Sequence, residues 1–532
     1  MKILKRSLII FILVLCIEFL FIKAYKVNVK WDLLKKISKE LMDNYVRKLD
    51  ESELLNNAIS GMLKNLDPYT NFYDPEETVL LESLIKGEYG GIGLTVDKRN
   101  GKIVVIAPME NSPAFRAGIQ PGDFIVKVNG IDVENEKITR VVSLVRGKPG
   151  KNVKITIQRG QNSKNLIEFN LKTEIIKVKD IPFFGILDED IGYIKISHFS
   201  KNAAGEFKKS LYSLIKKDLR GLIVDLRGNP GGLLNSAVRI SDFLLPRGRI
   251  IVFTRGKKKK YNVKYYSKEK PLLDDIPLVI IVDSGSASAS EIVAGAIQDN
   301  DRGVVIGTKT FGKGLVQTIF YPEKKMAFKI TTSEYFTPSG RSIHKYNNKL
   351  NISDSDTFFT HNNRIIISGG GIVPDILCDE DTTVKNIVSL MKKESIFLKF
   401  ATKYFSKDSL IIRHIPPEKE LLDNFYSFLE LEKFKIPVEG IKEIEYIKTL
   451  LTDNKYEAFL DSVKSYIYLK NKSKLYRIKG SLYKHLKKTI IEINIGENNT
   501  YKHIINDDPI VKIALEVVKD KFKYYSILNP EK

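Results

Sequence analysis

Residues 278–291 read Leu-Val-Ile-Ile-Val-Asp-Ser-Gly-Ser-Ala-Ser-Ala-Ser-Glu. The first five are aliphatic, as in a strand that is buried on both faces of a sheet. A turn of small residues follows, and residues 289–298 then have a helical pattern. Residues 222–245 repeat the order of buried strand, glycine-rich turn and helix. Repetition of this unit predicts a central sheet covered by helices.

The residue pattern changes along the chain in a way that predicts five regions. A basic and then apolar segment lies within residues 1–29, and residues 30–86 carry apolar residues at helical spacing. Residues 87–175 contain short β-branched strands, glycine-rich turns and one short helix. Strands and helices alternate in residues 176–380, and amphipathic helical patterns fill residues 381–532. We therefore expect an α+β multidomain protein with helical segments at both ends.

Length and composition are those of a folded globular chain. The 532 residues suggest about three domains. Hydrophobic residues make up 43% and charged residues 28%, which excludes a disordered, a collagen-like or a multi-span membrane protein. A net charge of +22 raises nucleic acid as a partner. The basic excess is spread along the chain, however, and its densest cluster, Lys257 to Lys260, is expected to be a solvated loop, so we expect no nucleic-acid partner.

The sequence predicts neither a metal site nor a cofactor. The chain has two cysteines, Cys16 and Cys378, and no disulfide between them is expected because Cys16 lies in the N-terminal apolar run. The sequence has no Cys/His cluster and no His-Glu-x-x-His string of the kind that binds zinc.

The N-terminus has the charge pattern of a membrane-targeting segment. Lys2, Lys5 and Arg6 precede an apolar run at residues 8–22, which Glu18 interrupts. A helix of this length reaches about 22 Å, less than the roughly 30 Å of a bilayer's hydrocarbon core. It suits a signal-peptide core, but no small-x-small cleavage signal follows. We expect an uncleaved signal anchor with a cytoplasmic N-terminus and the remainder exported; a buried N-terminal helix is the alternative.

Three serines, Ser286, Ser288 and Ser290, stand in the turn between the aliphatic strand and its helix. A nucleophile placed there would bring its oxyanion close to backbone N–H groups at the helix N-terminus. A structural role is equally open, because Ser288 and Glu291 have the spacing of a capping box.

Lys313 stands between two glycines in the string Thr-Phe-Gly-Lys-Gly-Leu-Val-Gln at residues 310–317. Desolvation in this largely apolar stretch would favour the neutral amine, which can serve as general base for a serine. Gln317, four residues on, can orient the lysine. A solvated surface lysine is the alternative.

A third string, Asp-Leu-Arg-Gly-Asn-Pro-Gly-Gly at residues 225–232, lies at another strand-to-helix turn. The N–H groups of Gly231 and Gly232 can face a developing oxyanion. A phosphate-binding turn and a simple tight turn are the alternatives, although the string lacks the Lys-Ser/Thr ending of a nucleotide-binding P-loop.

The three strings together, in this order, resemble those of the carboxy-terminal processing (tail-specific) serine proteases of bacteria and chloroplasts. The resemblance covers about residues 35–380 and implies a Clp protease/crotonase-like α/β protease core. It also implies that Ser288, 25 residues before Lys313, is the nucleophile and that Lys313 is its general base. In this resemblance Gln317 positions the lysine.

The same resemblance implies an oxyanion hole made by the amide of Ala289 and that of Gly231 or Gly232. Residues 381–532 are not part of the minimal family core. Combined with the predicted anchor, the resemblance implies a protein of the bacterial cell envelope, held in the inner membrane with its catalytic part on the periplasmic side.

The β-rich second region resembles the PDZ domain that such proteases carry. In PDZ domains the amides of one loop bind the C-terminal carboxylate of a peptide, which then adds to the sheet as a strand. A small β-domain of scaffold type is the alternative. The residues that match this loop are Gly90, Gly91, Ile92, Gly93 and Leu94.

We therefore expect an exported serine endopeptidase that binds protein or peptide substrates by their apolar C-terminal tails and cuts them with Ser288 and Lys313. One alternative is a PDZ adaptor that binds tails without cutting them. A different residue at position 288 or 313 would have favoured this alternative, but Ser288 and Lys313 are both present. Another is a crotonase-like acyl-CoA enzyme, against which the PDZ region and the anchor argue. Assembly into a homo-oligomer is left open.

Overall fold

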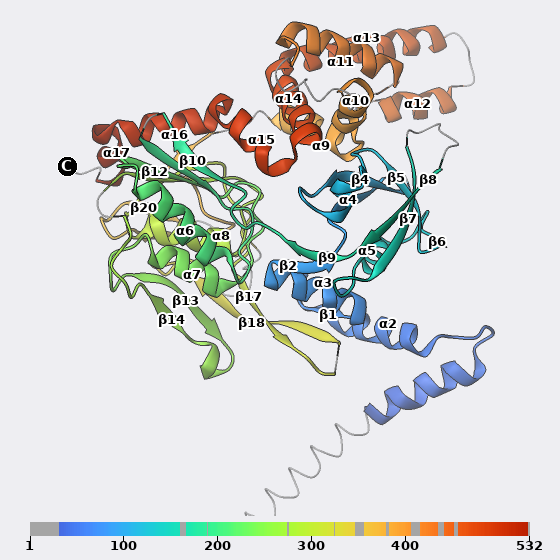
Figure 1. The fold of residues 1–532 in the computed structure, drawn as a ribbon, viewed down its shortest axis with the longest axis horizontal. Coiled ribbons are helices and arrows are strands. Elements are labelled where there is room, and N and C mark those ends of the chain that lie inside the picture. Colours follow the sequence, from blue (N-terminus) through green and yellow to red (C-terminus); the bar gives the residue numbers. More distant parts are fainter. Residues whose placement is uncertain are drawn as a thin grey trace, which may run out of the picture. The chain divides into compact units, whose positions relative to one another are not determined.

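The structure is a computed structural model (Figure 1). It describes residues 31–529 except 100, 160–165, 189, 274–275, 324, 346–355, 379–381, 406–414, 433, 435–440 and 452–455. The predicted anchor at residues 1–29 lies outside the described residues. Within the described part, none of the helices combines the length and the apolar character needed to span a bilayer. The chain forms two compact units, of which the smaller holds residues 31–74 and 317–331 and the larger holds the rest.

The smaller unit is mainly helical. Residues 31–44 and α2 (Glu51–Leu63) are helices, which confirms the prediction for this region. A short strand, β1 (Asn71–Tyr73), was not predicted; it pairs antiparallel with the first residues of β18 (Ala327–Phe336). Three residues are too few to show a strand's alternation, so this strand depends on its distant partner.

The predicted PDZ region in the larger unit is built on an antiparallel sheet of order β3-β4-β5-β7-β8, with β6 paired to β5. Its apolar core includes Val141 of α5, which contacts β3 and β5. These elements confirm the short strands and the one short helix that the sequence predicted for this region. The elements are α3 (Pro75–Lys86), β2 (Glu88–Gly91), β3 (Leu94–Arg99), β4 (Lys102–Pro108), α4 (Pro113–Arg116), β5 (Phe124–Val128), β6 (Ile131–Asp132), α5 (Ile138–Val145), β7 (Asn152–Gln158), β8 (Leu166–Lys172) and β9 (Glu174–Lys177).

A second sheet forms the centre of the region at residues 176–380. Its order is β10-β11-β12-β15-β16-β21, and all neighbours are parallel except β10 and β11. The aliphatic runs that predicted strands near residues 222 and 278 form β12 and β15. The strands are β10 (Phe183–Leu187), β11 (Ile191–Lys195), β12 (Gly221–Asp225), β15 (Leu278–Val282), β16 (Val304–Gly307) and β21 (Ile376–Leu377).

Helices cover both faces of this sheet (Figure 1). Leu222 and Val224 of β12 pack with α6 (Ala203–Ile215), α7 (Leu234–Asp242) and α8 (Ala289–Asp299). Ile223 of the same strand points the other way and packs with α16 (Pro509–Lys519) and α17 (Lys521–Leu528). The sequence predicted helices at residues 381–532, but not that the last two complete the core of the central sheet.

A third sheet follows the order β1-β18-β13-β14, and β17 also pairs with β18. The lysine cluster at residues 257–260 lies exposed between β13 and β14, as predicted for a solvated loop. A separate apolar core joins helices of the C-terminal extension. The remaining elements are β13 (Ile250–Gly256), η1 (Lys259–Tyr261), β14 (Lys264–Tyr266), β17 (Leu315–Phe320), β19 (Thr357–Phe359), β20 (Ile365–Ile367), α9 (Thr382–Lys393), α10 (Ile396–Phe405), α11 (Glu418–Leu431), α12 (Ile441–Leu450), α13 (Glu457–Arg477), α14 (Lys479–Ile495), α15 (Glu497–Ile504) and η4 (Ile505–Asp507).

Candidate active site

Ser288 is the N-cap residue of α8, at the end of the turn that follows β15. Its backbone angles are φ 55° and ψ −109°, a conformation that costs a non-glycine residue about 1–3 kcal/mol. Such strain persists only where surrounding contacts impose it, and it is concentrated at functional sites. Ser288 therefore stands out from its neighbours by its backbone alone.

The other two serines of the turn are buried and have structural partners. The hydroxyl of Ser286 donates to the carbonyl of Leu226 at 2.9 Å. The hydroxyl of Ser290 donates to the carbonyl of Asn229, also at 2.9 Å. Both bonds join the serine turn to the turn after β12. Ser288 is only half-buried, so the geometry separates three serines that their spacing left equivalent.

Glu291 links the serine turn to the loop that carries Lys313. Its carboxylate is fully buried and accepts hydrogen bonds from the backbone N–H groups of Ser288 (2.7 Å), Gly312 (2.7 Å) and Lys313 (2.9 Å) and from the hydroxyl of Thr310 (2.6 Å). Burial raises the pKa of Glu291 above its ordinary value, and the four donors oppose that rise. The sequence indicated only the capping role of Glu291, because its other donors come from a different strand–loop segment.

The side chain of Lys313 stands in the loop between β16 and β17 and is half-buried. Glu291 thus holds the backbone of the predicted base and that of the predicted nucleophile on one carboxylate. The lack of space around the two glycines that flank Lys313 explains why larger residues would not fit there. A Cβ at Gly312 would lie 2.8 Å from the backbone of Gly370, and one at Gly314 would lie 2.9 Å from the side chain of His344.

The glycine turn after β12 lies directly against the serine. A Cβ on Gly231 would be 2.8 Å from the Cβ of Ser288 and 3.0 Å from the nitrogen of Ala289, so only glycine fits. The N–H of Gly231 donates to the side-chain oxygen of Asn229 at 2.9 Å. Among the described residues, no acceptor is found for the N–H groups of Gly232 and Ala289. These two amides can therefore donate to a group that binds beside Ser288.

A buried cluster of charges fixes the start of the glycine turn. Asp225, at the end of β12, accepts hydrogen bonds from Tyr193 (2.6 Å), Lys195 (3.1 Å) and the guanidinium of Arg227 (2.6 Å). Burial alone would raise the pKa of Asp225, but Arg227 and Lys195 hold it well below its ordinary range. The guanidinium also pairs with Asp508, from the C-terminal extension, at 3.0 Å. No sequence motif near Asp508 indicated this contact with Arg227.

Gln317 lies in β17 and belongs to the smaller unit. Its amide nitrogen donates to the hydroxyl oxygen of Thr331 at 3.3 Å, and that hydroxyl donates to Asp67 at 3.0 Å. An ionised carboxylate can only accept hydrogen bonds, so Asp67 fixes the direction of both bonds and with it the orientation of the amide. This series of bonds was not predicted, because its three members are far apart in the sequence.

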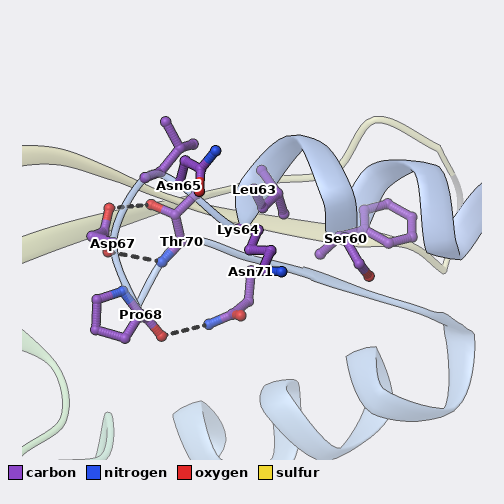
Figure 2. A pocket seen from close by; sticks show the side chains of 10 residues that line it. Ser60, Leu63, Lys64, Asn65, Asp67, Pro68, Thr70 and Asn71 are labelled. Atoms are coloured by element: carbon purple, nitrogen blue, oxygen red, sulfur yellow. Dashed lines mark hydrogen bonds between the residues drawn. The ribbon is translucent and has the colours of Figure 1, made fainter.

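Figure 2 shows a pocket of about 490 Å³ beside Asp67, lined by residues between Ser60 and Phe72. The carboxylate of Asp67 accepts hydrogen bonds from the N–H (3.0 Å) and the hydroxyl (2.8 Å) of Thr70, which fixes the turn after α2. The lining contains none of the predicted site residues, so the pocket is not a candidate active site.

The loop predicted to bind a peptide carboxylate is only partly a loop. Gly90 and Gly91 end β2 and pair with β9, which corrects the expectation that they belong to an open loop. Ile92 is buried, and Gly93 has φ 75°. Leu94 starts β3, which is an edge strand of its sheet. An edge strand carries backbone groups to which an extended peptide can pair.

No cluster of three or more His, Cys, Asp or Glu side chains able to hold a metal ion occurs in the part of the chain that the structure describes. Cys378 forms no disulfide bond with another described residue. Cys16 lies outside the described residues.

Comparison with known families gives three matches along the chain. Residues 190–353 match peptidase family S41, and residues 104–159 match a PDZ domain. Residues 23–78 match the N-terminal domain of the activating protease CtpB. The first match contains all three strings that the sequence singled out, and the second begins after the loop at residues 90–94.

Curated relatives share the same region. The carboxy-terminal-processing protease of Bartonella bacilliformis is 39% identical over 311 residues, which are 58% of this chain and 71% of the relative. The carboxy-terminal processing protease CtpA of Bacillus subtilis is 36% identical over 317 residues, 59% of this chain and 67% of the relative. A solved photosystem II D1 C-terminal processing protease is 26% identical, with a TM-score of 0.38, and the match covers 64% of this chain and 86% of that chain.

The strain at Ser288 predicts an unusual stability order. Ser288→Gly is expected to be more stable than Ser288→Ala by about 1–3 kcal/mol, because only glycine adopts this conformation without strain. The measurement is the free energy of unfolding by denaturant titration of the two variants. Ser427, on the exposed face of α11, is the control, where glycine should be less stable than alanine by about 1 kcal/mol. Equal stability of the two Ser288 variants would contradict the strain.

Proposed function

Because the chain belongs to peptidase family S41, whose members are serine peptidases, we propose that it is a C-terminal processing protease in which Ser288 is the nucleophile and Lys313 the general base. The observation that carries the assignment is the carboxylate of Glu291, which binds the backbone N–H groups of both residues. The strained N-cap position of Ser288 supports it as well.

In the proposed reaction the hydroxyl of Ser288 attacks the carbonyl carbon of the scissile peptide bond, and the neutral amine of Lys313 takes the proton. The amides of Ala289 and Gly232 stabilise the oxyanion that forms. Lys313 then returns the proton to the leaving nitrogen as the C–N bond breaks, which leaves an acyl ester on Ser288. A water molecule that gives its proton to Lys313 hydrolyses this ester and regenerates the hydroxyl.

Gly232 is the better candidate of the two glycines for the second oxyanion donor. The N–H of Gly231 is already used by Asn229, and a hydrogen bond within the turn would have to break before that amide faced a substrate. The contribution of Gly231 is steric, because its lack of a side chain lets the turn lie against Ser288.

Gln317 is assigned the role of positioning Lys313. The support is its place four residues after the lysine, the spacing that the resemblance to this family gives. An amide oxygen holds a lysine in place without adding a charge that would favour the ammonium form.

The PDZ domain is assigned the recognition of substrate tails. The family match at residues 104–159 and the edge position of β3 support this assignment. A peptide added to β3 would place its terminal carboxylate near the turn at Ile92 and Gly93, where backbone N–H groups can bind it.

The first test of the proposed function is mutation of the dyad. Ser288→Ala and Lys313→Ala are each expected to abolish cleavage of a protein with an apolar C-terminal tail. Lys313→Arg is expected to fail too, because arginine keeps its proton near neutral pH. The readout is gel analysis of the cleavage products. Ser286→Ala is the matched control and should still cut; a dead Ser286→Ala beside an active Ser288→Ala would reverse the assignment.

The second test concerns the substrate's terminal carboxylate. Amidation of that carboxylate should raise KM, because it removes the charge that the PDZ amides bind while the side chains stay the same. Small or apolar last residues should be favoured over charged ones by about 1–3 kcal/mol for each good contact. The measurement compares the cleavage rates of one fluorogenic peptide prepared with a free C-terminal carboxylate and with an amidated C-terminus. Equal rates for the pair below saturation would rule out tail recognition and leave the dyad intact.

We also propose that the protein is anchored in the inner membrane by residues 1–29, with the protease in the periplasm. The support is the run of basic and then apolar residues at the N-terminus. An alkaline phosphatase reporter fused after residue 532, which folds only outside the cytoplasm, is expected to be active and to sediment with membranes. A reporter that is inactive, with the protease soluble in the cytosol, would contradict this topology.

A further inference from the structure

We propose that Asp508, in the C-terminal extension, is a positioning residue of the active site: it holds Arg227 and thereby the glycine turn that carries Gly231 and Gly232. This inference rests on the proposed function of that turn in binding the oxyanion. Residues 381–532 lie outside the matches to peptidase family S41, PDZ and CtpB, so the proposal gives the extension a role in the reaction.

The guanidinium of Arg227 forms hydrogen bonds with two carboxylates from distant parts of the chain. Its Nη2 donates to Asp225 at 2.6 Å. Its Nη1 lies 3.1 and 3.0 Å from the two carboxylate oxygens of Asp508. The side chains of Arg227 and Asp508 are only 19% and 12% exposed, so water cannot replace either partner at full strength.

Asp508 supplies the second carboxylate of this cluster, and it also pairs with Lys484, a more exposed cation, at 2.9 Å. Asp225 already has a cation of its own in Lys195, at 3.1 Å. Without Asp508, two buried cations would face the single carboxylate of Asp225. The guanidinium would then lose the partner of one of its nitrogens and would shift to find water or another acceptor.

A shift of Arg227 would be transmitted to the glycine turn. The N–H of Arg227 donates to Asp225 at 2.8 Å, and the next N–H, that of Gly228, donates to Asp283 at 2.8 Å. Asn229 follows, and its carbonyl accepts the N–H of Ala287 at 3.0 Å. The turn is thus held at the serine end by backbone bonds and at the other end by Arg227.

Asp508 also caps a helix, so its charge can be removed while the cap is kept. It is the N-cap of α16, and its Oδ1 accepts the N–H groups of Ile510 (3.0 Å) and Val511 (3.4 Å). Asparagine caps a helix about as well as aspartate. Asp508→Asn therefore keeps the cap but removes the negative charge that pairs with Arg227 and Lys484.

The experiment measures kcat and KM of the full chain and of Asp508→Asn on the fluorogenic free-acid peptide, well below the unfolding temperature. We expect kcat to fall on the order of 100-fold, the effect of displacing a catalytic group by about 1 Å, with KM unchanged. Labelling of Ser288 by a fluorophosphonate, which also forms an oxyanion-like adduct, should slow by a similar factor.

Asp507→Asn is the matched control. It removes the same charge one residue earlier, where Asp507 pairs with Lys487 at 2.6 Å on the surface, and it should leave kcat unchanged. If Asp508→Asn does not fold, Asp508→Ser takes its place, because serine also caps helices.

Normal kcat and labelling in the Asp508 variant, with only a lower Tm, would overturn the positioning role. An equal loss of kcat in Asp507→Asn would overturn it as well. A wild-type chain that neither cuts nor is labelled would instead overturn the proposed function, and this inference with it.

Discussion

One buried carboxylate, that of Glu291, determines how the serine turn meets the lysine loop. Four hydrogen-bond donors meet at this carboxylate. Without it, each donor left buried and unpaired would cost about 1–3 kcal/mol. The two segments are therefore held in one register, although the helix α8 and the strand β16 separate them in the chain. The same carboxylate fixes the N–H of Ser288, which explains how a strained backbone persists at the proposed nucleophile.

The central sheet imposes the next constraint, because a parallel sheet needs apolar cover on both faces. Helices α6, α7 and α8 cover one face and α16 and α17 the other. The last two helices are thus part of the protease core rather than an appendage. Their position also explains why Asp508, which caps α16, reaches the charge cluster at Arg227.

Much of the fold could be predicted because its signals are local. Aliphatic runs such as residues 278–282 and the helix at residues 289–298 form where the sequence placed them. The choice of Ser288 among three serines came from the family resemblance, since spacing alone could not show that Ser286 and Ser290 are buried against another turn. Contacts between distant segments, such as that of Asp508, carry no local signal and were missed.

The pair of Arg227 and Asp508 closes a loop of 281 residues. Closing so long a loop costs chain entropy before the contacts that reward it have formed, and topologies rich in such contacts fold slowly. The charge cluster behind the glycine turn is therefore expected to be among the last parts of the protease to assemble. A chain that is still folding would therefore lack the fixed glycine turn that the finished protein holds against Ser288.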